Sequence, residues 1–503
     1  MSSINKLIKS GSQDKKITIK RRKVSKNNSI ICREPSQFFN TSKIVLPKSA
    51  FKNTSYEVKP ILHNNLTMTN KHYIGSLKNP IIRKRLVSVL TTPSNASLAN
   101  LVSPAKAKME FPMKPRDALI LYTHDLTGYE QAEILDYPEV YYLGQKSTKI
   151  PARLEFSNFG FDDNSSNLKI SKGDHLAFRY EILGILGKGS FGTVCECFDH
   201  KRSEKVAIKI IRNKKRFYHQ AGIEVSILSA LRENDQDDQQ PIIKMKSYFI
   251  FRKHVCISFD LWNHNLYELL KGNKFQGLSL GLIRRFAIQI LNGLSFLTKL
   301  EVIHCDLKPE NVLLKHPTRS DVVIIDFGSA TFHKEKQHTY IQSRFYRAPE
   351  IILGIPYTTA IDMWSLGCML CELFTGKPLL PGESEHDQLV LIIEMFGYPS
   401  ASVLSQSTKK SLFFEGNTLK NPTIKNSFLK IPSSKKLYES VPTEDQDFLD
   451  LIEKCLELDP ELRITPKAAL CHPFINSNFK HIKPKSSLNY LERKISKNKI
   501  IAH

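Results

Sequence analysis

The sequence predicts an α+β fold in which a small, β-rich lobe precedes a larger α-helical lobe. Short runs rich in Val, Ile and Phe, separated by turn residues, fill residues 178–262 and are typical of an antiparallel sheet. One helical pattern, at 217–232, interrupts them. From about residue 282 onward, apolar residues recur at helical spacing. The 503 residues, 41% of them hydrophobic, are enough for two to four folding units with a sizeable core.

The net charge of +24 is concentrated at the two ends of the chain. Residues 1–100 contain 19 Lys and Arg against 3 Asp and Glu, and residues 475–503 contain 7 against 1, which leaves only +2 for residues 101–474. We therefore expect two disordered basic tails, 1–110 and 475–503, and no basic face on the folded part. Nucleic acid is an unlikely partner on this evidence, beyond weak non-specific contact with the tails. The cluster Lys15–Lys23 is interpreted as a solvated charge run, with a nuclear import signal as the alternative.

Several classes of protein are disfavoured by composition. No run of 18 uncharged apolar residues suggests a membrane span, and the first residues lack the apolar core of a secretory signal. The nine cysteines do not suggest a disulfide framework, and Cys368 and Cys371, at i and i+3 of an apolar helix, are expected to be buried structural thiols. We expect a monomer in the cytoplasm, the nucleus or both, with no membrane partner.

Before the sheet, residues 111–136 carry apolar side chains at steps of mostly three and four, which predicts two short amphipathic helices ended by Pro138. A polar loop is expected at 157–175. Within the sheet region, two strands are predicted inside 246–262, broken near Arg252 and Lys253. In the helical region, residues 401–440 are rich in Ser, Lys and Asn and are expected to form a surface insertion before a helix at 444–458.

A glycine-rich segment, G-x-G-x-x-G-x-V, runs from Gly187 to Val194 between two predicted strands. Alone it is a weak signal, because a glycine hairpin without a ligand has the same pattern. A dinucleotide-binding fingerprint would open a helix, whereas this loop runs into a second strand. The following apolar strand contains Lys209, and a buried ammonium needs a partner. The carboxylate of Glu224, on the next predicted helix, has the right position, and a snorkelling surface lysine is the alternative.

The most specific segment is HCDLKPEN, from His304 to Asn311. Its spacing suits phosphoryl transfer: Asp306 would accept or orient a substrate hydroxyl proton, Lys308 would neutralise the transferring group, and Asn311 would hold a magnesium ion. Twenty residues after Asp306, an apolar run leads into the DFG triplet, so Asp326 stands where a strand would present a Mg²⁺ ligand.

On these motifs, residues 180–474 resemble a complete protein kinase domain of the CMGC group, with an N-lobe at 180–261 and a C-lobe at 262–474. The runs NLYELLKGNKFQG, HCDLKPENVLL, TYIQSRFYRAPEIILG and IDMWSLGCMLCEL are similar to those of the dual-specificity tyrosine-regulated kinase (DYRK) family. The segments DLTGYEQAEILDYPEVYYLG and GDHLAFRYEIL resemble the accessory region and adjoining box of its class 2 members, here at 111–179. That accessory region argues against class 1 and against the homeodomain-interacting kinases.

The resemblance implies a bilobal eukaryotic kinase fold, ATP and Mg²⁺ as cofactors, and protein Ser/Thr substrates. The implied catalytic residues are Asp306, Lys308 and Asn311, and the implied metal ligands are Asn311 and Asp326. Glu350 and Arg463 match a buried ion pair that braces the C-lobe. The implied nucleotide-binding residues are Leu186, Gly187, Lys188, Gly189, Ser190, Phe191, Gly192, Val194, Lys209, Glu224, Phe259, Asp260 and Leu261, with Phe259 as gatekeeper and backbone groups at Leu261 binding adenine.

The resemblance also implies activation by autophosphorylation of Tyr340, after which the kinase acts on serine and threonine, preferring proline just after the target and arginine a few places before it. The usual catalytic-loop arginine is Cys305 here, so Arg344 and Arg347 are the expected partners of a phosphate on Tyr340. A second family tyrosine is replaced by His338.

Two other functions remain open. A catalytically silent scaffold of the same fold should have lost Lys209, Asp306, Asn311 or Asp326, and the sequence keeps all four. A nucleic-acid-binding protein should depend on the basic tail at 1–100.

Overall fold

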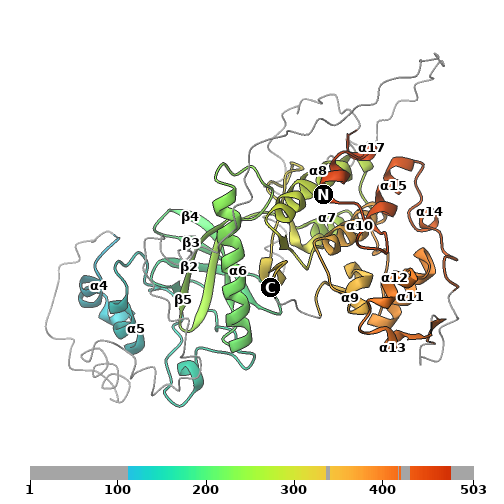
Figure 1. Cartoon of the computed structure of the whole chain (residues 1–503). Helices are drawn as coiled ribbons and strands as arrows, with labels where there is room; N and C mark the ends of the chain where they lie inside the picture. Colours follow the sequence, from blue (N-terminus) through green and yellow to red (C-terminus); the bar gives the residue numbers. More distant parts are fainter. Residues whose placement is uncertain (1–110, 336–339, 417, 421–430, 477–503) are drawn as a thin grey trace, which may run out of the picture.

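The computed structural model describes residues 111–335, 340–416, 418–420 and 431–476. The predicted basic tails, except for residues 475 and 476 at the start of the second, lie outside the described residues, as do the Lys15–Lys23 cluster and His338. The described part forms two lobes, with the sheet and its covering helix in one and most of the helices in the other (Figure 1).

The smaller lobe is a six-stranded antiparallel sheet with the strand order β1-β2-β3-β4-β6-β5. The helix α6 (Lys215–Asn234) lies beside this sheet (Figure 1). As predicted, the last two strands are broken at Arg252 and Lys253, whose positive φ angles form the tight turn between them. The strands are β1 (His175–Leu176), β2 (Tyr180–Lys188), β3 (Gly192–Asp199), β4 (Glu204–Ile211), β5 (Met245–Phe251) and β6 (His254–Asp260).

The larger lobe is built around α10 (Ala360–Thr375), where thirteen consecutive residues from Ile361 to Leu373 are buried. The other helices of this lobe are α7 (Leu266–Gly272), α8 (Leu280–Lys299), α9 (Pro349–Leu353), α11 (Glu385–Phe396), α12 (Ala401–Ser405), α13 (Lys410–Phe413), α14 (Leu437–Ser440), α15 (Gln446–Cys455), α16 (Pro466–Leu470) and α17 (Pro473–Asn476). Three short strand pairs join β7 (Val302–Ile303) to β10 (Thr331–Phe332), β8 (Val312–Leu314) to β9 (Val322–Ile324), and β11 (Phe414–Glu415) to β12 (Thr418–Leu419). Cys368 and Cys371 are buried in α10 as free thiols, as predicted.

The helix α8 is, among the described residues, the one helix long and apolar enough to cross a membrane by length and composition. It carries Arg284 and Arg285 within its first turns, and its apolar side packs against α10 and α16. Its buried residues, including Phe286, Ile290 and Leu294, belong to the main hydrophobic core. The apolar residues of α8 are therefore explained by their packing in the core of the helical lobe.

The segment that precedes the sheet contains the two predicted helices, α4 (Pro115–Leu121) and α5 (Gly128–Glu133), each followed by a short 3-10 turn, η1 (Thr123–Asp125) and η2 (Ile134–Asp136). The two helices lie on the side of the sheet away from the helical lobe (Figure 1). A capping box between Thr127 and Glu130 starts α5.

Two predictions of surface loops are wrong in part. The expected polar loop at 157–175 starts with a 3-10 turn, η3 (Ser157–Gly160), and buries Phe159, Phe161 and Leu168 against Tyr129. In the insertion at 401–440, five apolar residues belong to the main core. They are Val403, Leu404, Phe413, Phe414 and Leu437. In both segments the apolar residues occur singly or in runs of at most three among polar ones, so no periodic pattern marks them for burial.

A buried polar network joins the accessory segment to the sheet, and no pattern in the sequence marks it. Glu130 of α5 accepts hydrogen bonds from Arg252 (3.2 Å) and Lys149 (3.1 Å) and lies 3.0 Å from Nε2 of His175. The Nζ of Lys149 is also 2.7 Å from Asp174. Although ligand atoms of Glu130, Asp174 and His175 lie within 4.8 Å of one another, as in a metal site, Lys149 already pairs with both carboxylates and Arg252 pairs with Glu130.

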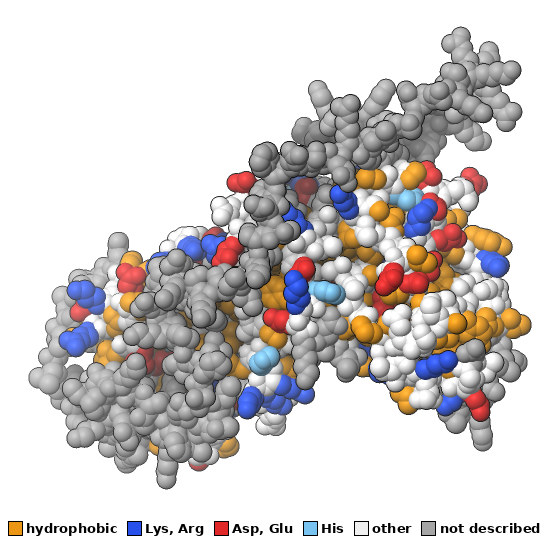
Figure 2. Space-filling view, in the orientation of Figure 1, with side chains coloured by type: hydrophobic (Ala, Val, Ile, Leu, Met, Phe, Trp, Pro, Cys, Tyr) orange, Lys and Arg blue, Asp and Glu red, His pale blue; other side chains and the backbone are white. Residues whose placement is uncertain are grey.

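On the face shown in Figure 2, acidic and basic side chains are interspersed over the described surface. This matches the small net charge of residues 101–474.

Candidate active site

The glycine-rich loop joins β2 to β3 as a tight hairpin, in which the N–H of Gly189 donates to the carbonyl of Gly192 (2.9 Å). A Cβ at Gly187 or Gly189 would meet no atom within 4 Å, whereas a Cβ at Gly192 would lie 2.0 Å from the carbonyl oxygen of Ile210. Glycine is therefore required at 192 by packing, and the space beside 187 and 189 is open to a ligand. Leu186, Lys188 and Ser190 are exposed along the same loop.

Lys209 lies on β4, opposite Val194 in the sheet register, and is buried. Its Nζ is 2.7 Å from Oε1 of Glu224 on α6 and 2.7 Å from Oδ1 of Asp326. The ion pair that the sequence predicts between Lys209 and Glu224 is therefore present, and the snorkelling alternative is wrong. Burial by itself would lower the pKa of Lys209, but the charges of Asp326 and Glu224 raise it, so the side chain stays an ammonium.

Asp326 lies two residues after the end of β9. It has a left-handed backbone, with a φ of 63°, and caps the start of the 3-10 turn η5 (Phe327–Ser329). Burial would raise the pKa of this carboxyl, but the charge and hydrogen bond of Lys209 lower it to about 2. Phe327 is fully buried and packs edge-on against His304, with ring centroids 5.1 Å apart. Asp326 of the helical lobe contacts Lys209 of the sheet, so both lobes contribute to one charged centre.

Asp306 lies in the loop between β7 and β8, and its carboxylate accepts four hydrogen bonds from three nearby residues. Its Oδ1 accepts from the N–H (3.0 Å) and Oγ (2.8 Å) of Ser343. Its Oδ2 accepts from Nζ of Lys308 (2.7 Å) and Nδ2 of Asn311 (3.2 Å). The three predicted catalytic residues therefore meet, and Ser343 occupies the side from which a hydroxyl can reach Asp306.

Asp362 of α10, which sequence reasoning missed, fixes the backbone of the loop that contains Asp306. Its carboxylate accepts the backbone N–H groups of His304 (2.8 Å) and Cys305 (3.1 Å). Cys305 has a left-handed φ of 64°, so these bonds fix an unusual backbone shape. The sequence signal for this contact was the position of Asp362 in a mainly apolar helix, where a carboxylate needs a partner.

The residues present fit a divalent cation. The backbone N–H of Ile325 donates to the carbonyl of Asn311 (2.9 Å), which brings Asn311 next to Asp326. Together they offer a carboxylate and an amide oxygen, the ligand types that Mg²⁺ prefers.

The link between the lobes contains the three predicted adenine-site residues. Phe259 is buried near the end of β6 and faces Met245 across the sheet. The carboxylate of Asp260 pairs with Nζ of Lys246 (2.6 Å), so it is directed to β5. Leu261 follows directly, with its backbone outside the strand.

Tyr340 is 62% exposed, and the guanidinium of Arg347 lies 4.0 Å from the centre of its ring. Hydrogen bonding to Arg347, with its positive charge and a weaker contribution from Arg344, lowers the pKa of Tyr340. Arg347 also contacts Glu385 (2.9 Å), and Arg344 contacts the carbonyl of Glu383 (2.5 Å). The structure thus brings together the three residues that the resemblance implied for regulation.

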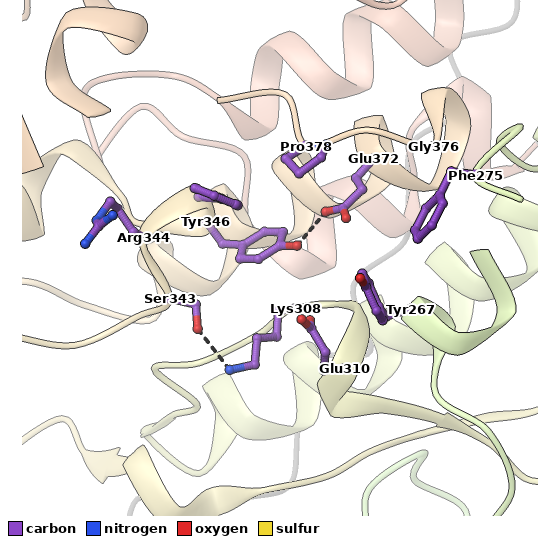
Figure 3. Close-up of a pocket in the computed structure, with 11 residues that line it drawn as sticks. Tyr267, Phe275, Lys308, Glu310, Ser343, Arg344, Tyr346, Glu372, Gly376 and Pro378 are labelled. Atoms are coloured by element: carbon purple, nitrogen blue, oxygen red, sulfur yellow. Dashed lines mark hydrogen bonds between the residues drawn. The ribbon is translucent and has the colours of Figure 1, made fainter. Parts of the chain in front are cut away.

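A cavity of about 570 Å³ opens beside Lys308 and Ser343 (Figure 3). Two carboxylates face it, Glu310 and Glu372, and Glu372 accepts a hydrogen bond from the Tyr346 hydroxyl (Figure 3). Oε2 of Glu310 is buried, and among the described residues no donor reaches it. Burial raises the pKa of Glu372 to about 7, with the hydrogen bond from Tyr346 opposing and the charge of Glu310 reinforcing this shift. Sequence reasoning assigned no role to either glutamate.

At the base of the helical lobe, Arg463 and Glu350 form a bidentate ion pair with N–O distances of 2.6 and 2.9 Å. Both side chains are completely buried. The pair implied by the resemblance is present.

Comparison with known proteins agrees with this geometry. Residues 180–475 match the protein kinase domain family. The chain is 47% identical over 384 residues to the human dual specificity tyrosine-phosphorylation-regulated kinase 4, covering 76% of this chain and 73% of that protein. It is 48% identical over 373 residues to the Drosophila melanogaster dual specificity tyrosine-phosphorylation-regulated kinase 2, covering 73% of this chain and 52% of that protein. It is also 47% identical to a probable serine/threonine-protein kinase dyrk2 of Dictyostelium discoideum, covering 72% of this chain and 40% of that protein. With a charged centre shared by two lobes and this degree of identity, the chain belongs to the DYRK family of protein kinases.

Proposed function

We propose that this chain is an active kinase that transfers the γ-phosphate of ATP to serine and threonine in protein substrates and to its own Tyr340, with Mg²⁺ as the cation. The observation that carries the proposal is the pairing of Lys209 with Asp326, 2.7 Å apart, across the two lobes. In the same site, Lys308 and Asn311 both donate to the carboxylate of Asp306. These pairings support the proposal, because phosphoryl transfer requires such groups from the protein.

Each residue has a role that follows from its contacts. Lys209, held by Glu224, would bind the α and β phosphates. Asp326 and Asn311 would hold Mg²⁺, which when bound neutralises charge on the phosphates. Asp306 already accepts a hydrogen bond from a serine hydroxyl, that of Ser343, and a substrate hydroxyl would donate to the same carboxylate.

The two glutamates of the cavity support a preference for basic residues near the target. Glu310 and Glu372 both line the cavity, and two carboxylates there favour a cationic partner from outside the chain. The cavity lies next to Lys308, and a guanidinium could bridge Glu310 and Glu372. This agrees with the expected arginine a few places before the target.

A feature of Gln342 supports the expected proline after the target. Gln342 has a positive φ of 63°, and its carbonyl accepts from Nη2 of Arg347 (2.8 Å). That carbonyl is therefore already engaged and is not available to a substrate N–H. Proline lacks the N–H, so it loses no hydrogen bond there.

The position of Tyr340 supports its modification. It is exposed, and the two arginines beside it would make charge-assisted contacts with a phosphate. A scaffold without activity would have no need to retain the paired Lys209, Asp306 and Asp326, which makes it the weaker candidate.

The test is mass spectrometry of the full chain expressed in bacteria, beside the Asp306→Asn variant. We expect one phosphate on Tyr340 in the wild type and none in the variant. Peptide phosphorylation at serine by the purified wild type, absent in the variant, would establish the second specificity. A folded wild-type protein with neither activity would favour the scaffold.

A further inference from the structure

From outside the sheet, the carbonyls of the glycine-rich loop accept hydrogen bonds from Arg212, which follows β4 on the way to α6. Its backbone N–H donates to the carbonyl of Phe191 (3.0 Å), and its Nη2 donates to the carbonyl of Gly189 (2.9 Å). Two carbonyls of the loop tip are therefore fixed by a single side chain and its own backbone. Phe191 also packs on Phe217 of α6, but residues 187–190 are exposed and Gly187 and Gly189 have open space beside them, so this part of the loop depends most on Arg212.

The guanidinium of Arg212 is itself oriented by the accessory region. Its Nε donates to Oδ1 of Asn167 (3.0 Å). The other end of that amide is fixed, because Nδ2 of Asn167 donates to Oδ2 of Asp163 (3.0 Å) and its backbone N–H donates to Oδ1 of the same residue (2.8 Å). With the amide nitrogen engaged by Asp163, the amide oxygen must face Arg212.

The same accessory segment is anchored to the start of α6, the helix that carries Glu224. Oδ2 of Asp162 accepts from Nδ2 of Asn213 (2.9 Å), and Oδ1 lies 3.0 Å from Nε2 of the fully buried His254. The backbone N–H of Asn213 donates to the carbonyl of Ser166 (2.8 Å). The segment is therefore held by contacts that do not involve the glycine-rich loop.

We propose that residues 162–167 of the accessory region position the glycine-rich loop for ATP, through the path Asn167 to Arg212 to the carbonyl of Gly189. Arg212 and Asn167 are positioning residues, because neither lies among the predicted phosphate, metal or substrate contacts. Without Asn167 the guanidinium regains rotational freedom, and the loop must be ordered when ATP binds. The charged centre of Lys209, Glu224 and Asp326 is not touched, so the chemical step on bound ATP keeps its rate. The inference rests on the proposed use of ATP.

The test is steady-state kinetics of the full chain with a fixed peptide and varied ATP, beside titration with a fluorescent ADP analogue. For Asn167→Ala we expect the KM for ATP and the Kd for the analogue to rise by about three- to tenfold, the range for one partly exposed hydrogen bond to a charged group. The kcat and the KM for the peptide should stay within about twofold of wild type. Arg212→Ala should have a similar effect, and the double variant should be no worse than the worse single variant, because both residues act in one path.

The matched control is Asn164→Ala, which removes the same side chain from an exposed position in the same segment and takes no part in these hydrogen bonds. It should keep the wild-type KM for ATP. An unchanged KM in Asn167→Ala would overturn the inference, as would effects of the two variants that simply multiply in the double variant. A fall in kcat together with a lower melting temperature would indicate a structural role instead. Absence of phosphate transfer by the wild type would count against the proposed function, while the analogue titration would still test the inference.

Discussion

Nζ of Lys209 lies 2.7 Å from Oε1 of Glu224 and 2.7 Å from Oδ1 of Asp326, so one ammonium ties together the sheet, α6 and the helical lobe. Each of the two carboxylates alone would be costly to bury, and the shared cation stabilises both. The contact of Lys209 with Glu224 also docks α6 on the sheet, as the proposed phosphoryl transfer would need.

Replacing Asp326 with asparagine should abolish phosphate transfer and leave the fold intact. The amide has the same volume, and Lys209 keeps Glu224 as its partner, but the charge for a metal ion is lost. We expect at least a hundredfold lower kcat/KM with a peptide substrate, about 3 kcal/mol of transition-state stabilisation. Circular dichroism should be unchanged. Wild-type turnover by purified Asp326→Asn would contradict the assignment.

Preference for arginine near the target should strengthen as pH rises through 7. Burial raises the pKa of Glu372 to about 7, so the carboxyl is neutral at pH 6 and charged at pH 8, and only the charged form attracts a guanidinium. The measurement is the ratio of kcat/KM for two peptides that differ by arginine or alanine at that place. Glu372→Gln should flatten the pH dependence of this ratio. A ratio that falls with pH would refute the role of the cavity.

The same carboxyl should make the fold less stable as pH rises. Its pKa in the folded chain lies above its ordinary value of 4.5, so the folded state holds the proton more tightly. The stabilisation is complete below about pH 4.5 and is lost as pH rises through about 7. Comparing the melting temperatures of wild type and Glu372→Gln between pH 5 and 8 isolates this contribution, since the glutamine has no proton to lose. Equal slopes in the two proteins would show that Glu372 does not contribute.

Replacing Glu350 with glutamine should destabilise the helical lobe strongly. The change leaves the charge of completely buried Arg463 uncompensated, which costs about 3–5 kcal/mol. The matched control is Glu301→Gln, whose partner Lys334 is 79% exposed, and which should destabilise the fold much less. Urea denaturation gives both values. Equal losses in the two variants would contradict the argument from burial.

A phosphate on Tyr340 should order the activation segment through Arg344 and Arg347. We expect the phosphorylated chain to melt a few degrees higher than the same protein after tyrosine phosphatase treatment. In Arg344→Ala the difference should shrink, because one of two cations is gone. A phosphatase-treated protein with an unchanged melting temperature would argue against this contact.

The clustering of the candidate site residues could be predicted from sequence because their spacing is short and specific. Asp306, Lys308 and Asn311 lie within six positions, and Asp326 follows an apolar strand, so local structure alone brings them close. The pairing of Lys209 with Glu224 was also predictable, because a buried lysine needs a carboxylate and the next helix offered one.

Other features depended on residues far apart in the chain, and no local pattern marks such contacts. The sequence places Phe159 and Phe161 in a polar loop, and only the folded chain shows that they pack against Tyr129. Asp362 contacts the backbone of His304 across 58 positions.

The sequence by itself determined the fold class and the family and predicted which residues gather at the candidate site, because motif spacing and hydrophobic period are local properties. Only the tertiary structure decided how the accessory region meets the glycine-rich loop through Asn167 and Arg212, and how Glu310 and Glu372 come to share one cavity. The physical reason is that a hydrogen bond or a shared cavity depends on distances of a few ångströms, and the folded chain sets those distances between residues that the sequence keeps far apart.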